Sequence, residues 1–214
     1  MKHPRRAMLI LLIVFTLLTG LFLFLAPDII PAHYNARGEV DRMGSKYEYL
    51  LFPAILWLFG GLVMLGVKKD VPNGKVIMTS LFIGLLPLAA IFLFLMGAAL
   101  RRGGASLPGT YELILKVSAL CIGVPLLFLA NLMPKATRNG VFGLRTKWSM
   151  MNDALWQKSQ RFGGISGVVT GLLIVFCALI LPSHWPLTAS MILILLWAAA
   201  GIWASYHYYK KQTS

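Results

Sequence analysis

Residues 131–164 read NLMPKATRNGVFGLRTKWSMMNDALWQKSQRFGG, and they are the longest stretch of the chain that is not dominated by apolar residues. This stretch carries six basic side chains, one acid (Asp153) and a dense cluster of tryptophan, asparagine, glutamine and glycine. Long apolar runs lie on both sides of it, and residues 27–48 are the other notable polar segment. Two polar blocks set among apolar runs therefore organise the sequence.

The composition is typical of a membrane protein. Of the 214 residues, 58% are hydrophobic and 13% are charged, and the mean hydropathy is +0.75. A soluble domain is about 45–50% apolar and about 25% charged. The formal net charge of +13 would suit a nucleic-acid-binding protein, but such proteins gather their cations on a soluble domain. Here the cations lie between apolar runs, which indicates membrane topology and attraction to anionic lipids, with no direct binding of nucleic acid.

Six apolar runs approach or exceed the roughly 20 residues that a helix needs to cross a bilayer. They are Ala7–Ala26, Tyr49–Val67, Val76–Leu100, Leu113–Met133, Ile165–Leu181 and Leu187–Ser205. The basic start of the chain resembles a signal peptide, but the length of the first run and the proline after it favour a retained helix. Continuous runs predict helices rather than a barrel. We therefore expect an all-α integral membrane protein with six transmembrane helices in a single domain, residues 1–214.

The distribution of basic residues predicts the orientation. With the N-terminus inside, the segments on the cytoplasmic side hold 14 Lys and Arg residues, and those on the outer side hold 5. Cytoplasmic segments are enriched in Lys and Arg. An even number of helices then places both termini in the cytoplasm. Residues 27–48 become an outer loop, and residues 131–164 become an inner one.

The inner block predicts a helix stop, a turn and an amphipathic helix. Pro134 ends the fourth apolar helix, and the Asn-Gly pair at 139–140 is a turn signal. From Trp148 onward, bulky residues recur near helical spacing until a Gly-Gly pair at 163–164 ends the pattern. This indicates a helix lying at the membrane interface. The alternative is a plain connector, although the 31 residues of Pro134–Gly164 are more than a connector needs.

The outer block, PDIIPAHYNARGEVDRMGSKYE, is expected to form a hairpin or small cap on the outer face. Its prolines favour extended backbone, and its glycines are turn signals. His33 with Asp28, Glu39 and Asp41 offers ligands that suit a divalent metal. However, the spacing matches no defined motif, so a solvated loop with local hydrogen bonds is preferred, and neither a metal nor a cofactor is predicted.

No catalytic motif is found in the sequence. All seven acids lie in loops or at helix ends, which counts against an enzyme and against an ion-coupled transporter. Lys116 follows Glu112 by four residues and is interpreted as a snorkelling ion pair. Asn131 either bonds across helices or satisfies a terminal carbonyl. Cys121 and Cys177 lie in apolar runs and are interpreted as small buried hydrophobes.

The two polar blocks contain recurring patterns. The outer block reads IPxHxNxxGEVDRxGSK, and the inner block reads NxMPKxxxNxxFGxRTxW followed by WxKxxRxGG. In both blocks the chain resembles the SdpI/YfhL family, bacterial immunity proteins for a sporulation-delaying toxin. The two patterns occur in order and on opposite predicted faces, so the resemblance extends from the first loop to the fifth helix.

The resemblance implies a multi-pass protein of the cell membrane that protects its cell from an extracellular toxic peptide. It also implies that the toxin-bound protein holds a cytoplasmic ArsR-type winged-helix repressor at the membrane. The residues expected to sense the toxin are Asp28, His33, Asn35, Glu39 and Asp41. The residues expected to bind the inner partner are Asn131, Lys135, Asn139, Arg145, Trp148, Trp156 and Arg161.

Two other functions stay open at this point. A membrane enzyme or small-solute carrier would need the polar residues of the two blocks to converge, and opposite faces of a bilayer forbid this unless one loop folds into the helix bundle. A membrane protein with a housekeeping or envelope-stress role and no toxin partner would carry the same blocks.

Overall fold

The computed structural model describes residues 3–35, 40–67, 73–102, 110–182 and 184–213. The elements in chain order are α1 Pro4–Leu25, β1 Ile29–Tyr34, β2 Val40–Ser45, the 3-10 helix η1 Lys46–Leu50, α2 Leu51–Gly66, α3 Gly74–Arg102, α4 Thr110–Leu132, the 3-10 helix η2 Met133–Lys135, α5 Asp153–Ile180 and α6 Trp185–Thr213. Within these ranges, six helical segments are long and apolar enough to cross a membrane. The expectation of six helices is confirmed.

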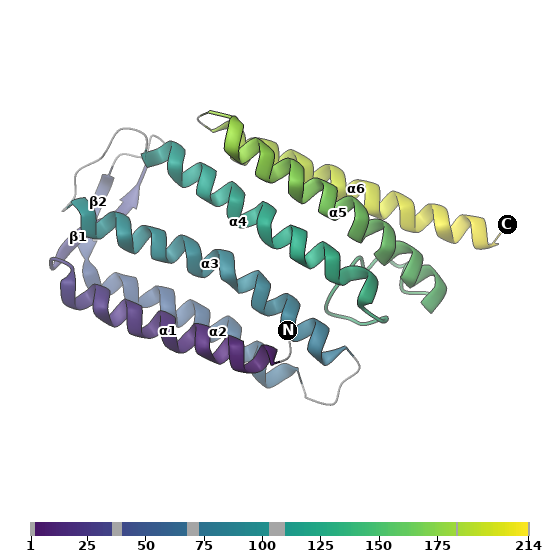
Figure 1. The fold of residues 1–214 in the computed structure, drawn as a ribbon, viewed down its shortest axis with the longest axis horizontal. Coiled ribbons are helices and arrows are strands. Elements are labelled where there is room, and N and C mark those ends of the chain that lie inside the picture. Colours follow the sequence, from purple (N-terminus) through teal and green to yellow (C-terminus); the bar gives the residue numbers. More distant parts are fainter. Residues whose placement is uncertain (1–2, 36–39, 68–72, 103–109, 183, 214) are drawn as a thin grey trace.

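The helices form two groups of three that meet along α3 and α4 (Figure 1). Strands β1 and β2 lie at one end of the bundle, and the loop between α4 and α5 lies at the other (Figure 1). Both termini lie at the end away from the strands. The two polar blocks are therefore separated by the length of the helices.

Strands β1 and β2 pair antiparallel, so the expected hairpin is confirmed and the fold is mostly rather than wholly α-helical. Of the two expected turn signals, Arg37-Gly38 lies outside the described residues, and Met43-Gly44 lies within β2 opposite Ile30 and Pro31, so the turn expected there does not form. Aromatic side chains attach the hairpin to the first helix group: the Tyr49 ring lies 4.9 Å from that of Phe22 and 4.7 Å from that of Phe52. The Tyr49 hydroxyl also donates a hydrogen bond of 3.2 Å to the Pro31 carbonyl. The hairpin thus packs on the helix ends.

The predicted interfacial helix does not exist as a separate element, and this corrects the sequence analysis. Trp148 lies in a turn before the helix, and α5 continues from Asp153 through the Gly-Gly pair to Ile180. The Asn152 side chain caps the new start by accepting a hydrogen bond of 2.9 Å from the Leu155 N–H. The two glycines allow close packing within the helix: a Cβ at Gly163 would lie 2.6 Å from Met133 Cε in η2, and a Cβ at Gly164 would lie 2.8 Å from the Ala130 carbonyl oxygen in α4.

Candidate functional site

The loop of residues 133–152, called the long loop below, is fastened to α5 by one buried amide. The Gln160 side chain has no exposed surface. Its Oε1 accepts a hydrogen bond of 2.9 Å from the Leu144 N–H, and its Nε2 donates one of 2.9 Å to the Leu144 carbonyl. Gly143 has a φ of +107°, and a Cβ there would lie 2.9 Å from Gln160 Cδ. Glycine is therefore required by both backbone conformation and space.

A second attachment explains Trp156 differently from the sequence analysis. This residue is 1% exposed, and its Nε1 donates a hydrogen bond of 2.7 Å to the Ala136 carbonyl. A side chain buried in this way presents no surface to a protein partner. Trp156 was expected to contact the inner partner. The structure instead gives it a structural role, because its side chain joins α5 to the start of the long loop.

The far end of the long loop is tied to α6. Ser149 is fully buried, and its Oγ donates a hydrogen bond of 2.8 Å to the Leu144 carbonyl. The Thr146 and Ser205 hydroxyls lie 2.8 Å apart, and the Trp148 ring centroid lies 5.0 Å from that of Tyr206. The long loop is therefore a packed element that joins α4, α5 and α6.

The other expected inner residues have different settings. The Asn139 Oδ1 accepts hydrogen bonds from the Val141 and Phe142 N–H groups at 2.9 and 2.8 Å, which confirms the predicted turn. Arg145 donates to the Gly140 carbonyl and lines a cavity of about 510 Å³ between the long loop, α4 and α6. Residues Lys135 and Arg161 are exposed on η2 and α5.

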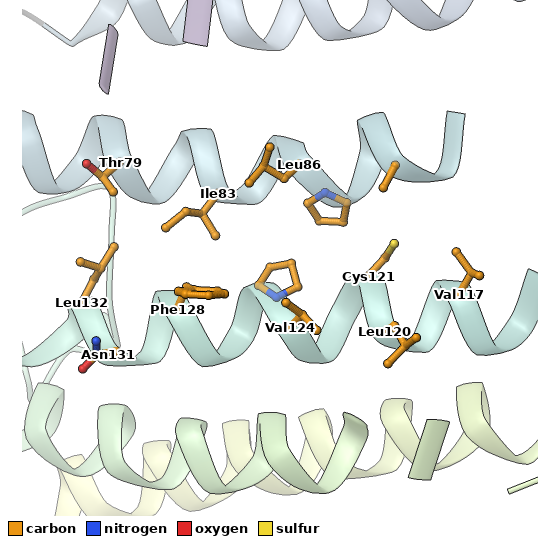
Figure 2. Close-up of a pocket in the computed structure, with 13 residues that line it drawn as sticks. Thr79, Ile83, Leu86, Val117, Leu120, Cys121, Val124, Phe128, Asn131 and Leu132 are labelled. Atoms are coloured by element: carbon orange, nitrogen blue, oxygen red, sulfur yellow. The ribbon is translucent and has the colours of Figure 1, made fainter. Parts of the chain in front are cut away.

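Asn131 lies at the end of α4, before the long loop. It is among the residues that line an apolar groove of about 610 Å³ between α3 and α4, next to Leu132 on α4 (Figure 2). Neither of its two expected hydrogen bonds is present among the described residues. Asn139, Arg145 and Trp148 do not line this groove. The convergence that an enzyme or carrier at these blocks would require is absent from the described part of the chain.

In the hairpin, charged side chains from both strands come together. His33 Nδ1 lies 2.6 Å from Asp41 Oδ1, and the two side chains are 63% and 41% exposed. Arg42 forms a two-bonded pair with Glu48, at 3.1 and 2.8 Å. The hydrogen bond and then the charge of Glu48 raise the pKa of Arg42 above its usual value.

The remaining hairpin residues do not gather around His33. Asp28 pairs with Lys46 at 3.0 Å, and Lys46 also donates to the Ala26 carbonyl at 3.2 Å. Asn35 is partly buried, whereas Glu39 lies outside the described residues. No group of three His, Cys, Asp or Glu side chains able to hold a metal ion occurs in the described ranges. What the hairpin offers is a surface of paired charges.

Two features of the helices were missed by sequence reasoning. The first is Gln160 as the buried support of the long loop. The second is the repeat of glycines at residues 163, 167 and 171, which brings α5 against α4 and α6. The small-xxx-small spacing of these glycines is a known signal for close helix packing in membranes, and it was readable in the sequence. Of the smaller expectations, the pair of Lys116 and Glu112 is confirmed at 2.8 Å.

The six long apolar helices and the two polar ends define a multi-span helical membrane protein. Residues 135–205 match the model of the SdpI/YfhL protein family, and residues 10–57 match a domain of unknown function, DUF1648. The chain is 24% identical over 205 residues to the immunity protein SdpI of Bacillus subtilis (strain 168), covering 94% of each chain. No solved structure matches. Residues 135–205 are thus similar to the SdpI/YfhL family, and the chain is a distant homologue of that immunity protein over nearly its full length.

Proposed function

We propose that this protein is an immunity protein of the cell membrane that protects its cell against an extracellular toxic peptide. The observation that carries the proposal is the similarity to the immunity protein SdpI across 94% of both chains. The matched regions include most of the long loop and the whole of α5, and they also include the hairpin. The proposed orientation puts the hairpin outside, with the long loop and both termini in the cytoplasm, because Lys and Arg are concentrated at that end.

In this proposal the hairpin senses or blunts the toxin, and Asp28, His33, Asn35, Glu39 and Asp41 are the residues assigned to it. The pair of His33 and Asp41 supports the assignment, since it presents both polar groups at an exposed edge of the sheet. A peptide that bears complementary charge or hydrogen-bonding groups would find these side chains already held in place.

Expression in a toxin-sensitive host tests this function. Cells that carry the gene are expected to grow at a toxin dose that kills the same host with an empty vector. His33→Ala is expected to reduce the protection because it breaks the pair with Asp41. Thr188→Ala is the control, since Thr188 lies exposed in the first turn of α6 and bonds only to the His184 carbonyl among the described residues. Unchanged killing of cells that contain the protein in their membrane would refute the proposal.

The long loop is proposed to relay the presence of the toxin by holding a cytoplasmic ArsR-type repressor. Its exposed cations, Lys135 and Arg145, would face an acidic surface of that partner, and Asn139 would set the turn between them. A relay requires the toxin to bind two conformations of the protein with unequal affinity. The long loop could transmit such a change because it contacts α4, α5 and α6 together.

Arg145→Ala is expected to weaken recruitment of the repressor to membranes by roughly thirtyfold or more, because the loss of one partner of an interfacial charge pair costs about 2 kcal/mol. Recruitment is measured as the membrane-bound fraction of a tagged repressor. Arg145→Lys, which keeps the charge, should retain part of it, and Arg6→Ala is the control at the same end. Full recruitment by Arg145→Ala at normal protein level would exclude this role.

A further inference from the structure

A groove between α5 and α6 gathers three basic residues, and none of the described residues that line it is an acid. Lys158 and Arg161 come from α5, and Lys211 comes from the last turn of α6. The groove has a volume of about 560 Å³. It includes the last turn of α6, which lies at the end of the bundle away from the strands (Figure 1). We call it the basic groove.

No acid in the described part of the chain neutralises the charges of the basic groove. None of the three cations forms an ion pair in the described ranges. Residues 154–214 contain no Asp and no Glu. The preceding acid, Asp153, is already paired with Arg138 at 3.0 Å. Cations held together on two packed helices repel one another, so an external anion would stabilise them.

The walls of the basic groove change from charged to apolar along the helix axis. Phe162 and Ile165 lie on the side toward the apolar part of α5, and Tyr208 lies one turn before Lys211 on α6. From Lys158 to Ile165 the helix rises about 10 Å. The head-group layer of one leaflet is roughly 5–7 Å thick. With Lys158 at the level of the head groups, Ile165 would therefore lie in the hydrocarbon.

From this combination we infer that the basic groove binds the phosphodiester head group of an anionic phospholipid, with its acyl chain along Phe162 and Ile165. Basic pockets between transmembrane helices suit such head groups. The neighbouring serine, Ser166, is not part of the head-group site, because its hydroxyl already donates to the Phe162 carbonyl and accepts from Trp197. This site goes beyond the proposed immunity function and does not depend on it.

The test measures the affinity of the full-length protein in neutral detergent for three probes: short-chain phosphatidylglycerol, short-chain phosphatidylcholine and inorganic phosphate. The wild type should bind phosphatidylglycerol in preference to the other two. Each of Lys158→Gln, Arg161→Gln and Lys211→Gln should weaken that binding about fivefold, and the triple variant on the order of a hundredfold. If the triple variant does not fold, the three single variants still test the site.

The matched control is the triple variant Arg6→Gln, Lys75→Gln and Lys147→Gln, which removes the same charge from exposed positions outside the groove. Wild-type affinity in this control would support a site rather than a diffuse attraction. Three results would overturn the inference: equal losses in both triple variants, equal binding of phosphatidylcholine, or binding of inorganic phosphate as tight as that of phosphatidylglycerol. The last would identify a site for a free anion.

Discussion

Replacing Gly164 with alanine is expected to lower the melting temperature of the detergent-solubilised protein by about 6 °C, which corresponds to about 2 kcal/mol in a chain of this size. A Cβ at this position would lie 2.8 Å from the Ala130 carbonyl oxygen and 2.9 Å from the Pro134 ring. The obstacles are a backbone atom and a ring, which cannot rotate away. The helices α4 and α5 would have to separate, and the contacts along their seam would weaken.

The matched control for this experiment is Gly20→Ala. Gly20 lies inside α1, and a Cβ there would meet no atom within 4 Å. Alanine is the better helix former by about 1 kcal/mol, so this variant should be unchanged or slightly more stable. A melting temperature of Gly164→Ala equal to that of the wild type would show that α4 and α5 are not in close contact at this point.

The same glycines show where sequence reasoning reached its limit. The six helices were predictable because lipid leaves the backbone few other structures, and an apolar run of sufficient length is visible in one dimension. The continuation of the inner helix past residue 164 was not predictable, because Gly163-Gly164 near a polar segment is a common stop signal. Its true role, close contact with Met133 and the Ala130 carbonyl, depends on a second helix. A stop signal and a packing site look alike until the partner is known.

The residues of the candidate site divide in the same way. The turn at Asn139 and the hairpin of residues 29–45 follow from local side-chain chemistry, and both were predictable. The burial of Trp156 was not, because a tryptophan at a membrane interface has equal reason to face outward. The hydrogen bond between Gln160 and Leu144 joins residues that are 16 positions apart in the sequence. Because the segment between them includes a non-helical loop, no periodic pattern in the sequence indicates this bond.

Loss of the hydrogen bond between Gln160 and Leu144 is expected to have the other large effect. Gln160→Leu keeps the volume of the side chain but removes the acceptor for the Leu144 N–H, while the Leu144 carbonyl keeps its bond from Ser149 Oγ at 2.8 Å. A buried N–H without a partner costs about 1–3 kcal/mol. We therefore expect a loss of about 2 kcal/mol in the free energy of unfolding, together with release of the long loop from α5.

Hydrogen exchange of peptides that cover residues 141–148 measures the release directly. In Gln160→Leu these amides should exchange faster than in the wild type, while peptides from the middle of α1 should be unchanged. Gln157→Leu is the matched control, since Gln157 lies one turn earlier on the exposed side of α5 and should alter stability by less than about 0.5 kcal/mol.

If recruitment of the repressor needs a docked loop, Gln160→Leu should lose this recruitment although Arg145 is intact. Normal exchange in Gln160→Leu would contradict the role of this amide as the support of the long loop. Normal exchange would also leave Trp156 as the attachment that holds the loop, through its bond to the Ala136 carbonyl.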